Sequence, residues 1–183
     1  PYVEAWSKKT GNEVTMLDVS LSTETVDLAK GYDGIDIQQT TNVHEPVVYE
    51  KLASFGLKQL TARMVGFEII NLQAATDNGL TVPNIAAYSP RAIAELGVTQ
   101  AMRLIRQLGY FDQRMAEGNF LWRGMISQEI HNLTVGIIGA GHIGGASAQI
   151  YTALGAKVLA VDPAYNVELE PYLEYTDLDT VLT

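Results

Sequence analysis

The sequence predicts an α/β protein, in which short parallel strands alternate with helices. Three observations carry this prediction. Short apolar segments alternate with segments of helical periodicity through most of the 183 residues. The connections between them are only a few residues long, as α/β units require. A glycine-rich turn between Leu133 and Gly145 then joins an apolar strand to another helical pattern.

The first half of the chain opens with a helical pattern and then alternates between strands and helices. Strands are expected at residues 13–19, 34–39, 57–64 and 80–85. Further helices are expected at residues 22–30, 45–55 and 71–78. Ser22 is a suitable N-cap, and Pro46 fits the first turn of a helix. Gly56 and Gly79 stand where helix C-caps belong.

The second half begins with a longer helix over residues 89–108. Ser89 and Pro90 start it and Gly109 ends it, and we interpret it as the link between two domains. The aromatic side chains after it, Phe120 and Trp122, are expected to pack into a core. The remaining elements are a short helix at 111–117, an irregular segment at 119–132, a strand from 133, a helix to about 154, a strand at 157–162 and a helix at 177–183.

Composition excludes several classes of function. The net charge is -9 and the isoelectric point is near 4.7, so nucleic acid and anionic membranes are poor partners and small ligands are favoured. The absence of cysteine excludes disulfides and thiolate chemistry. We find neither a signal peptide nor a membrane span, predict no metal site, and expect a cytoplasmic protein.

The glycine-rich turn has the spacing of a dinucleotide-binding motif. Gly139, Gly141 and Gly144 form the pattern G-x-G-x-x-G directly after an apolar strand, so backbone N–H groups at a helix N-terminus would face a pyrophosphate. A second strand ends in Asp162, 18 residues after Gly144, where a carboxylate is expected to bind the ribose hydroxyls of NAD. A phosphate on that ribose would meet the same negative charge, so NAD is favoured over NADP.

Hydride transfer between a nicotinamide and a hydroxyl carbon needs an acid/base for the hydroxyl proton, and the carboxylate of a 2-hydroxy acid would need a cation. Histidine and arginine are the usual residue types for these roles. None of the three histidines, His44, His131 and His142, stands at a promising position for the acid/base. The turn Val65-Gly66 follows a strand and can offer two backbone N–H groups to a carboxylate. Tyr88 is expected at the same edge of the sheet. The spacing selects none of four arginines, Arg63, Arg91, Arg103 and Arg106.

These motifs resemble the D-isomer-specific 2-hydroxyacid dehydrogenase family, and within it the bacterial D-lactate and D-2-hydroxyisocaproate dehydrogenases. The matching segments cover essentially the whole chain in the family's order. They are residues 63–66 (RMVG), 88–95 (YSPRAIAE), 133–144 (LTVGIIGAGHIG), 154–158 (LGAKV) and 160–163 (AVDP). The resemblance implies that residues 1–88 form a flavodoxin-like substrate domain lacking its first strand. It implies that residues 89–183 form a linking helix and the first part of a Rossmann NAD-binding domain.

The resemblance also implies an activity and assigns residues to it. The activity is NAD-dependent interconversion of 2-keto acids and D-2-hydroxy acids, by a homodimer that pairs through its NAD domains. Dinucleotide contacts fall on His142, Ile143 and Asp162, in and beyond the glycine turn. Substrate contacts fall on the amides of Val65 and Gly66 and on Tyr88.

The family's catalytic Arg, Glu and His have no positions in this chain. By the resemblance they are expected beyond Thr183, and the family's opening strand is expected before Pro1. We therefore expect an incomplete piece of a longer protein, one that is inactive by itself.

Departures from the family pattern leave alternatives open. Met64 replaces the usual Asn, and residues 67–71 replace the usual Asp-Asn-Ile-Asp turn. Ile37, in place of a tyrosine before the Gln38-Gln39 pair, points to a roomier pocket, and lactate and branched-chain substrates both remain open. Two other functions also remain: an NAD(H)-sensing, corepressor-like interaction protein on the same scaffold, and a formate or phosphoglycerate dehydrogenase relative.

Overall fold

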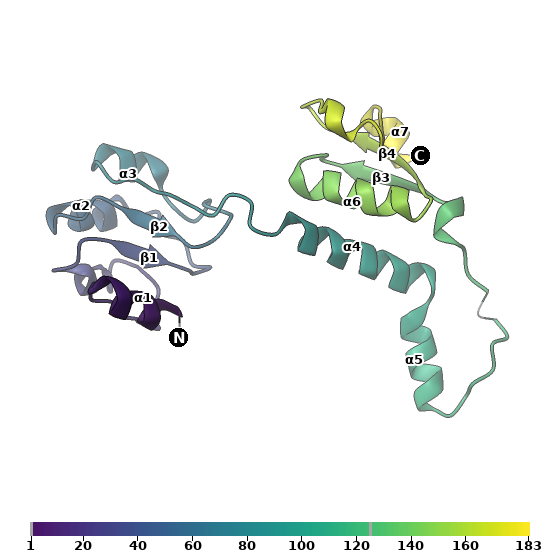
Figure 1. Cartoon of the computed structure of the whole chain (residues 1–183), viewed down its shortest axis with the longest axis horizontal. Coiled ribbons are helices and arrows are strands. Elements are labelled where there is room, and N and C mark those ends of the chain that lie inside the picture. The colour runs from purple at the N-terminus through teal and green to yellow at the C-terminus, as the bar shows by residue number, and fades with distance from the viewer. Residues whose placement is uncertain (1, 125) are drawn as a thin grey trace. The chain divides into compact units, whose positions relative to one another are not determined.

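A computed structural model describes residues 2–124 and 126–183 and divides the chain into two compact units, between Tyr88 and Ser89 (Figure 1). Each unit contains a parallel sheet with helices packed against it, as the predicted α/β class requires. Each unit also has its own cluster of buried apolar side chains.

The first unit is built around a two-stranded parallel sheet. Its elements are α1 (Tyr2–Thr10), η1 (Val26–Ala29), β1 (Ile35–Ile37), α2 (Pro46–Ser54), β2 (Leu60–Ala62) and α3 (Leu72–Asp77). β1 pairs with β2 in a register that sets Ile35 opposite Leu60. Pro46 stands in the first turn of α2, as predicted. Asn71 caps α3, since its side chain accepts a hydrogen bond from the N–H of Ala74.

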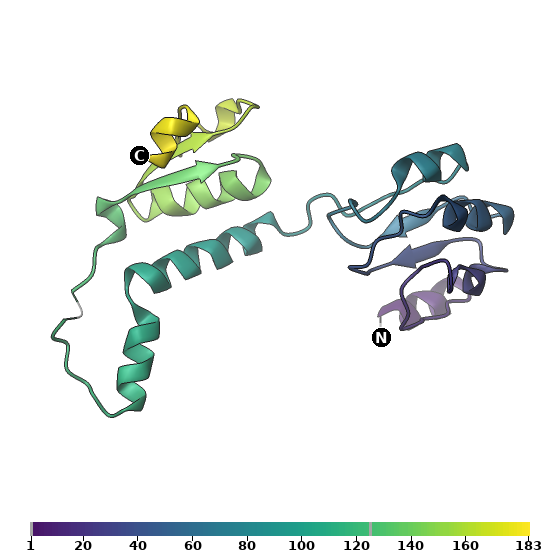
Figure 2. The same ribbon diagram turned by 180° about the vertical axis from the view of Figure 1, so that it is seen from behind.

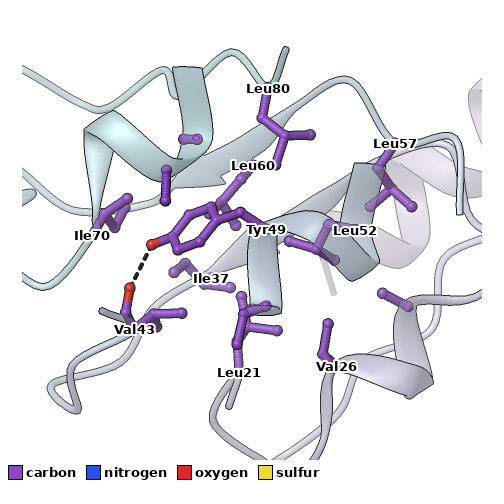
Figure 3. Close-up of a cluster of buried hydrophobic side chains, with 14 of the residues drawn as sticks. Leu21, Val26, Ile37, Val43, Tyr49, Leu52, Leu57, Leu60, Ile70 and Leu80 are labelled. Atoms are coloured by element: carbon purple, nitrogen blue, oxygen red, sulfur yellow. Dashed lines mark hydrogen bonds between the residues drawn. The ribbon is translucent and has the colours of Figure 1, made fainter. Parts of the chain in front are cut away.

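The core of the first unit surrounds Tyr49 of α2 (Figure 3). Apolar side chains from both strands and from the flanking turns surround its ring, among them Ile37, Leu60 and Ile70. The Tyr49 hydroxyl donates to the carbonyl of Val43 at 2.5 Å and accepts from the N–H of Asn71 at 2.8 Å. A buried polar atom is thereby satisfied from both sides, and it ties α2 to the segments that lead into α2 and α3.

Three predictions for the first unit were wrong or only partly correct. Residues 13–19 form no strand, and four of their apolar side chains, Val14, Met16, Leu17 and Val19, are exposed. Residues 22–30 form only the short turn η1 instead of a full helix, although the hydroxyl of Ser22 does accept from the N–H of Glu24 at 3.2 Å.

The predicted strand at residues 80–85 is reduced to isolated bridges beside β2. Thr81 and Ile85 donate their N–H groups to the carbonyls of Lys58 and Met64, but Pro83 between them has no N–H to donate. The ladder is interrupted there, so the segment follows β2 without becoming a regular strand.

The second unit contains a three-stranded parallel sheet in the order β3-β4-β5. Its elements are α4 (Pro90–Ile105), α5 (Leu108–Ala116), η2 (Ile130–Asn132), β3 (Thr134–Ile138), α6 (His142–Ala153), β4 (Lys157–Val161), η3 (Val167–Leu169), β5 (Glu174–Tyr175) and α7 (Leu178–Leu182). α4 packs along α6, and α7 packs against β3 and β4 (Figure 1). The predicted long helix is therefore integrated into the second unit.

That helix ends earlier than predicted. α4 stops at Ile105, and a new helix, α5, contains Gly109, which was expected to end the first one. The break lies at Gln107, which adopts the left-handed conformation with φ 54°. Gln107 is the one non-glycine residue with positive φ in the described part of the chain.

The aromatic residues after α5 do not join a core, which contradicts the prediction. Phe120 and Trp122 are each about three-quarters exposed, and Leu121 and Ile126 are exposed as well. α5 and the stretch after it extend away from the sheet of the second unit in both views (Figures 1 and 2). Among the described residues, no helix is both long and apolar enough to cross a membrane.

Candidate functional site

The glycine turn connects β3 to the N-terminus of α6. Gly139 follows the strand and has φ +92°, a backbone conformation that residues with a side chain rarely adopt. Its N–H donates to the carbonyl of Val161 at the end of β4. The first bond of the helix runs from the N–H of Gly145 to the carbonyl of Gly141 at 2.7 Å. The N–H groups of the helix's first turn, which includes His142 and Ile143, therefore have no partner within the helix.

The other two glycines of the motif meet different steric demands. A Cβ at Gly144 would lie 1.9 Å from the carbonyl oxygen of Gly139, so only glycine permits this close packing of helix on turn. A Cβ at Gly141 would meet no protein atom within 4 Å, so the space in front of that residue is open. The open space lies beside the free N–H groups, which is the arrangement that a pyrophosphate needs.

Asp162 directly follows β4 and contacts the glycine turn. Its Oδ2 accepts from the N–H of Ala140 at 2.6 Å, and its Oδ1 accepts from the N–H of Ala164 at 2.7 Å. The sequence predicted the position of this carboxylate near a ribose but did not predict its bond to the turn. Each carboxylate oxygen keeps lone-pair capacity for a further donor.

The turn Val65-Gly66 lies just beyond the end of β2. Asn84 fixes it from the neighbouring segment by donating from Nδ2 to the carbonyl of Val65 at 2.8 Å. In the described chain, the N–H groups of Val65 and Gly66 donate to no other residue. Two successive free N–H groups at the carboxyl edge of a parallel sheet form a suitable anion site.

Glu68 is a neighbour of this turn that the sequence analysis did not single out. A Cβ on Gly66 would lie 2.6 Å from Oε2 of Glu68, so the carboxylate lies directly against the Cα of Gly66. The carbonyl of Glu68 contacts Nε2 of His44 at 3.0 Å, which links His44 to the same loop. The signal in the sequence was the departure from the family pattern at residues 67–71, which marks an altered loop without revealing its contacts.

Tyr88 is 74% exposed and lies between the segment beside β2 and α4. In the described structure its hydroxyl makes no hydrogen bond. The structure therefore does not join Tyr88 to Val65-Gly66 through a direct bond.

The candidate arginines and histidines make mostly local contacts. Three arginines form exposed ion pairs: Arg63 with Asp36, Arg91 with Glu95, and Arg103 with Asp112. Burial raises the pKa of Asp36, and Arg63 opposes that shift. His131 pairs with Glu129, and His142 is the first residue of α6. Among the described residues, no three His, Asp or Glu side chains are grouped to bind a metal ion.

The parallel sheet, the glycine turn and the acidic residue at the end of the second strand define the class of dinucleotide-binding α/β proteins. A family model described as D-isomer specific 2-hydroxyacid dehydrogenase, catalytic domain, matches residues 1–169. The chain belongs to this family, which confirms the resemblance predicted from the sequence.

Curated relatives agree with this assignment. A D-2-hydroxyacid dehydrogenase (NAD(+)) of Clostridioides difficile is 40% identical over 179 residues, covering 97% of this chain and 54% of the relative. A D-lactate dehydrogenase of Lactiplantibacillus plantarum is 40% identical over 178 residues, covering 97% of this chain and 53% of the relative. The chain thus spans about half the length of the curated relatives it matches.

Solved structures share the fold. The D-lactate dehydrogenase of Lactobacillus jensenii with NAD+ is 50% identical, with a TM-score of 0.82 over 98% of this chain and 55% of that one. The NAD-complexed D-isomer specific 2-hydroxyacid dehydrogenase of Lactobacillus delbrueckii ssp. bulgaricus is 50% identical, with a TM-score of 0.83 over 100% and 56%. A D-2-hydroxyisocaproate dehydrogenase is 36% identical, with a TM-score of 0.87 over 98% and 55%. These matches confirm the predicted fold class.

Proposed function

We propose that this chain is the cofactor-binding and substrate-binding part of an NAD-dependent D-2-hydroxyacid dehydrogenase, similar to the D-lactate dehydrogenases. The observation that carries the proposal is the glycine turn with Asp162 bonded to it, in a chain that belongs to this family. The whole enzyme interconverts 2-keto acids and D-2-hydroxy acids, with NAD supplying or accepting the hydride.

The second unit binds the cofactor in this proposal. The turn from Gly139 to Gly144 offers N–H groups to the pyrophosphate, including those of His142 and Ile143, and the positive end of the α6 dipole attracts the phosphates. Asp162 accepts hydrogen bonds from the ribose hydroxyls, and its charge disfavours the phosphate of NADP.

The first unit binds the substrate carboxylate. The free N–H groups of Val65 and Gly66 donate to it, and the exposed hydroxyl of Tyr88 is available to the same ligand. No histidine of the described chain lies at this turn with a free ring positioned for proton transfer, since His44 already contacts the carbonyl of Glu68. We therefore assign the acid/base of the reaction to a residue outside these 183 residues, where the family resemblance implies a catalytic Arg, Glu and His.

The domain assignment follows from these roles. Residues 1–88 are the substrate domain, and residues 89–183 are α4 and the first part of the NAD-binding domain. We further propose a homodimer that pairs through the NAD-binding domains and works in the cytoplasm. Support for pairing comes from the exposed apolar side chains of α5 and of the residues after it. Support for the compartment is the lack of cysteine among the 183 residues.

A titration with NADH and NADPH tests the cofactor site. Replacing Asp162→Ala is expected to weaken NADH binding by about 1–3 kcal/mol, because polar partners lose a charged acceptor. The same change is expected to narrow the gap between NADH and NADPH. Glu168→Ala removes an equal charge from an exposed position in η3 and serves as the matched control. Unchanged affinities for both cofactors in Asp162→Ala would exclude the ribose contact.

Turnover measurements test whether this chain binds the ligands while residues outside it supply the acid/base. The chain as printed is expected to bind NADH without oxidising it when pyruvate or a branched 2-keto acid is added. Keto-acid-dependent oxidation of NADH by this chain alone would contradict the assignment of proton transfer to residues outside it.

A further inference from the structure

The carboxylate of Asp162 joins two backbone segments in the free protein. One oxygen accepts from Ala140 in the glycine turn, and the other accepts from Ala164 two residues further along the chain. A contact with a ribose requires neither of these bonds. Both are short, charge-assisted hydrogen bonds to N–H groups, and the side chain is half-buried, so they are of the strong kind.

The bond to Ala140 also decides which N–H groups face a ligand. The Ala140 N–H is directed at Asp162, and the Gly139 N–H is directed at Val161, so neither is available to a phosphate. The donors that remain are those of Gly141 and of the first turn of α6. Without the carboxylate of Asp162 as an acceptor, the peptide group that carries the Ala140 N–H would be free to rotate. A different set of N–H groups would then face the ligand.

We propose that Asp162 is a positioning residue of the diphosphate site: it fixes the glycine turn before the cofactor binds, in addition to its ribose contact. The inference rests on the proposed function for the identity of the ligand, but the bonds that support it belong to the free protein. It follows that ribose recognition and diphosphate binding share one side chain. A substitution made only to change the cofactor preference would loosen the diphosphate site as well.

The geometry requires an aspartate. Two N–H groups approach two different oxygens of one short side chain. An asparagine has a single acceptor oxygen, and its NH₂ group would face one of the two N–H donors. A glutamate side chain is longer by one methylene, so its two carboxylate oxygens would be displaced from the N–H groups of Ala140 and Ala164.

Amide hydrogen exchange of the free chain, followed by NMR, tests the positioning role without any ligand. In Asp162→Asn and Asp162→Ala, the exchange of the Ala140 N–H is expected to quicken at least about tenfold, the equivalent of one lost charge-assisted bond. The N–H of Val158, inside β4, is expected to keep its protection and serves as an internal control. Unchanged protection of Ala140 in both variants would overturn the proposal. If Asp162→Ala unfolds the second unit, the exchange of the Ala140 N–H in Asp162→Asn alone decides whether Asp162 fixes the glycine turn.

Binding of inorganic pyrophosphate, which has no ribose, tests the consequence for the ligand. Asp162→Asn is expected to bind it at least about threefold more weakly than Glu168→Gln, which removes the same charge without touching the turn. Equal or tighter binding in Asp162→Asn would show that Asp162 acts only through the ribose. If the unmodified chain binds neither NADH nor pyrophosphate, the proposed cofactor site fails, whereas the exchange of Ala140 still decides the positioning role.

Discussion

Tyr49 is the largest fully buried side chain among the described residues, and two backbone groups share its hydroxyl. Tyr49→Phe is expected to lower the free energy of unfolding by about 1–3 kcal/mol, because the carbonyl of Val43 loses its hydroxyl donor and the N–H of Asn71 keeps only a longer bond, at 3.4 Å, to that carbonyl. Urea unfolding measures this difference. Tyr110→Phe, on the exposed side of α5, is the control and should stay within about 0.5 kcal/mol.

The same hydroxyl gives the chain a sensitivity to alkaline pH. Burial raises the pKa of Tyr49 above its usual value, so the folded state holds this proton more tightly than the unfolded state. The stabilisation is fully present below the unfolded pKa of about 10 and is lost as the pH rises towards the folded value. Burial raises the pKa of Tyr151 as well. The free energy of unfolding, measured across this pH range, should therefore fall less steeply in Tyr49→Phe than in the unmodified chain. The part of the fall that is left in Tyr49→Phe includes the contribution of Tyr151.

Glu68 places a negative charge beside the proposed anion site. Glu68→Gln is expected to tighten pyruvate binding about two- to fivefold, because two like charges about 4 Å apart repel by about 1 kcal/mol when water fully screens them. The shifts of the Val65 and Gly66 amides in an NMR titration measure the affinity. Glu50→Gln, on the exposed side of α2, is the control for net charge. An unchanged affinity in Glu68→Gln would mean that this carboxylate turns away from the bound anion.

At the scale of elements, the boundary between α4 and α5 depends on Gln107 in the left-handed conformation. Gln107→Gly is expected to stabilise the second unit by up to about 1 kcal/mol, since glycine adopts this conformation without steric cost. Gln100→Gly, in the interior of α4, should instead destabilise it by about 1 kcal/mol. Thermal unfolding compares the two variants, and destabilisation by both would show that the Gln107 side chain makes a contact that outweighs the backbone strain.

Helices with clear start signals were predictable, and weakly marked strands were not. Pro46 and Pro90 mark the first turns of α2 and α4, because the fixed φ of proline suits a helix N-terminus. Ser22, the other predicted start signal, leads only into the short turn η1. Residues 13–19 have the apolar content of a strand, but a strand forms only where a neighbour supplies ladder bonds, and that is a tertiary property. Pro83 was the visible warning that the strand at 80–85 would be interrupted.

The candidate site was predictable in its positions but not in its bonds. The spacing of Gly139, Gly141 and Gly144 and the place of Asp162 at a strand end are local patterns. The bond from Ala140 to Asp162 spans 22 residues and depends on the register of β3 against β4. The position of Glu68 depends on a side-chain rotamer, which no spacing rule specifies.

At the scale of the whole molecule, α5 and the segment after it carry many exposed apolar side chains. The most exposed of these are Phe120, Leu121, Trp122 and Ile126. If they cover a partner subunit, Phe120→Ser combined with Trp122→Ser should shift sedimentation towards the monomer. Tyr2→Ser removes an even more exposed aromatic side chain from the first unit and should leave the sedimentation unchanged. A monomer in the unmodified chain at high concentration would contradict the proposed dimer.

β3 pairs on one side only among the described residues, since the order of the sheet is β3-β4-β5. Its sequence, Thr-Val-Gly-Ile-Ile, contains no lysine or proline to discourage further pairing, and Ile138 is exposed. Such an edge is a template on which any extended chain can add a strand. In concentrated solution, we therefore expect misassembly to begin at β3, the strand that leads directly into the glycine turn of the proposed cofactor site.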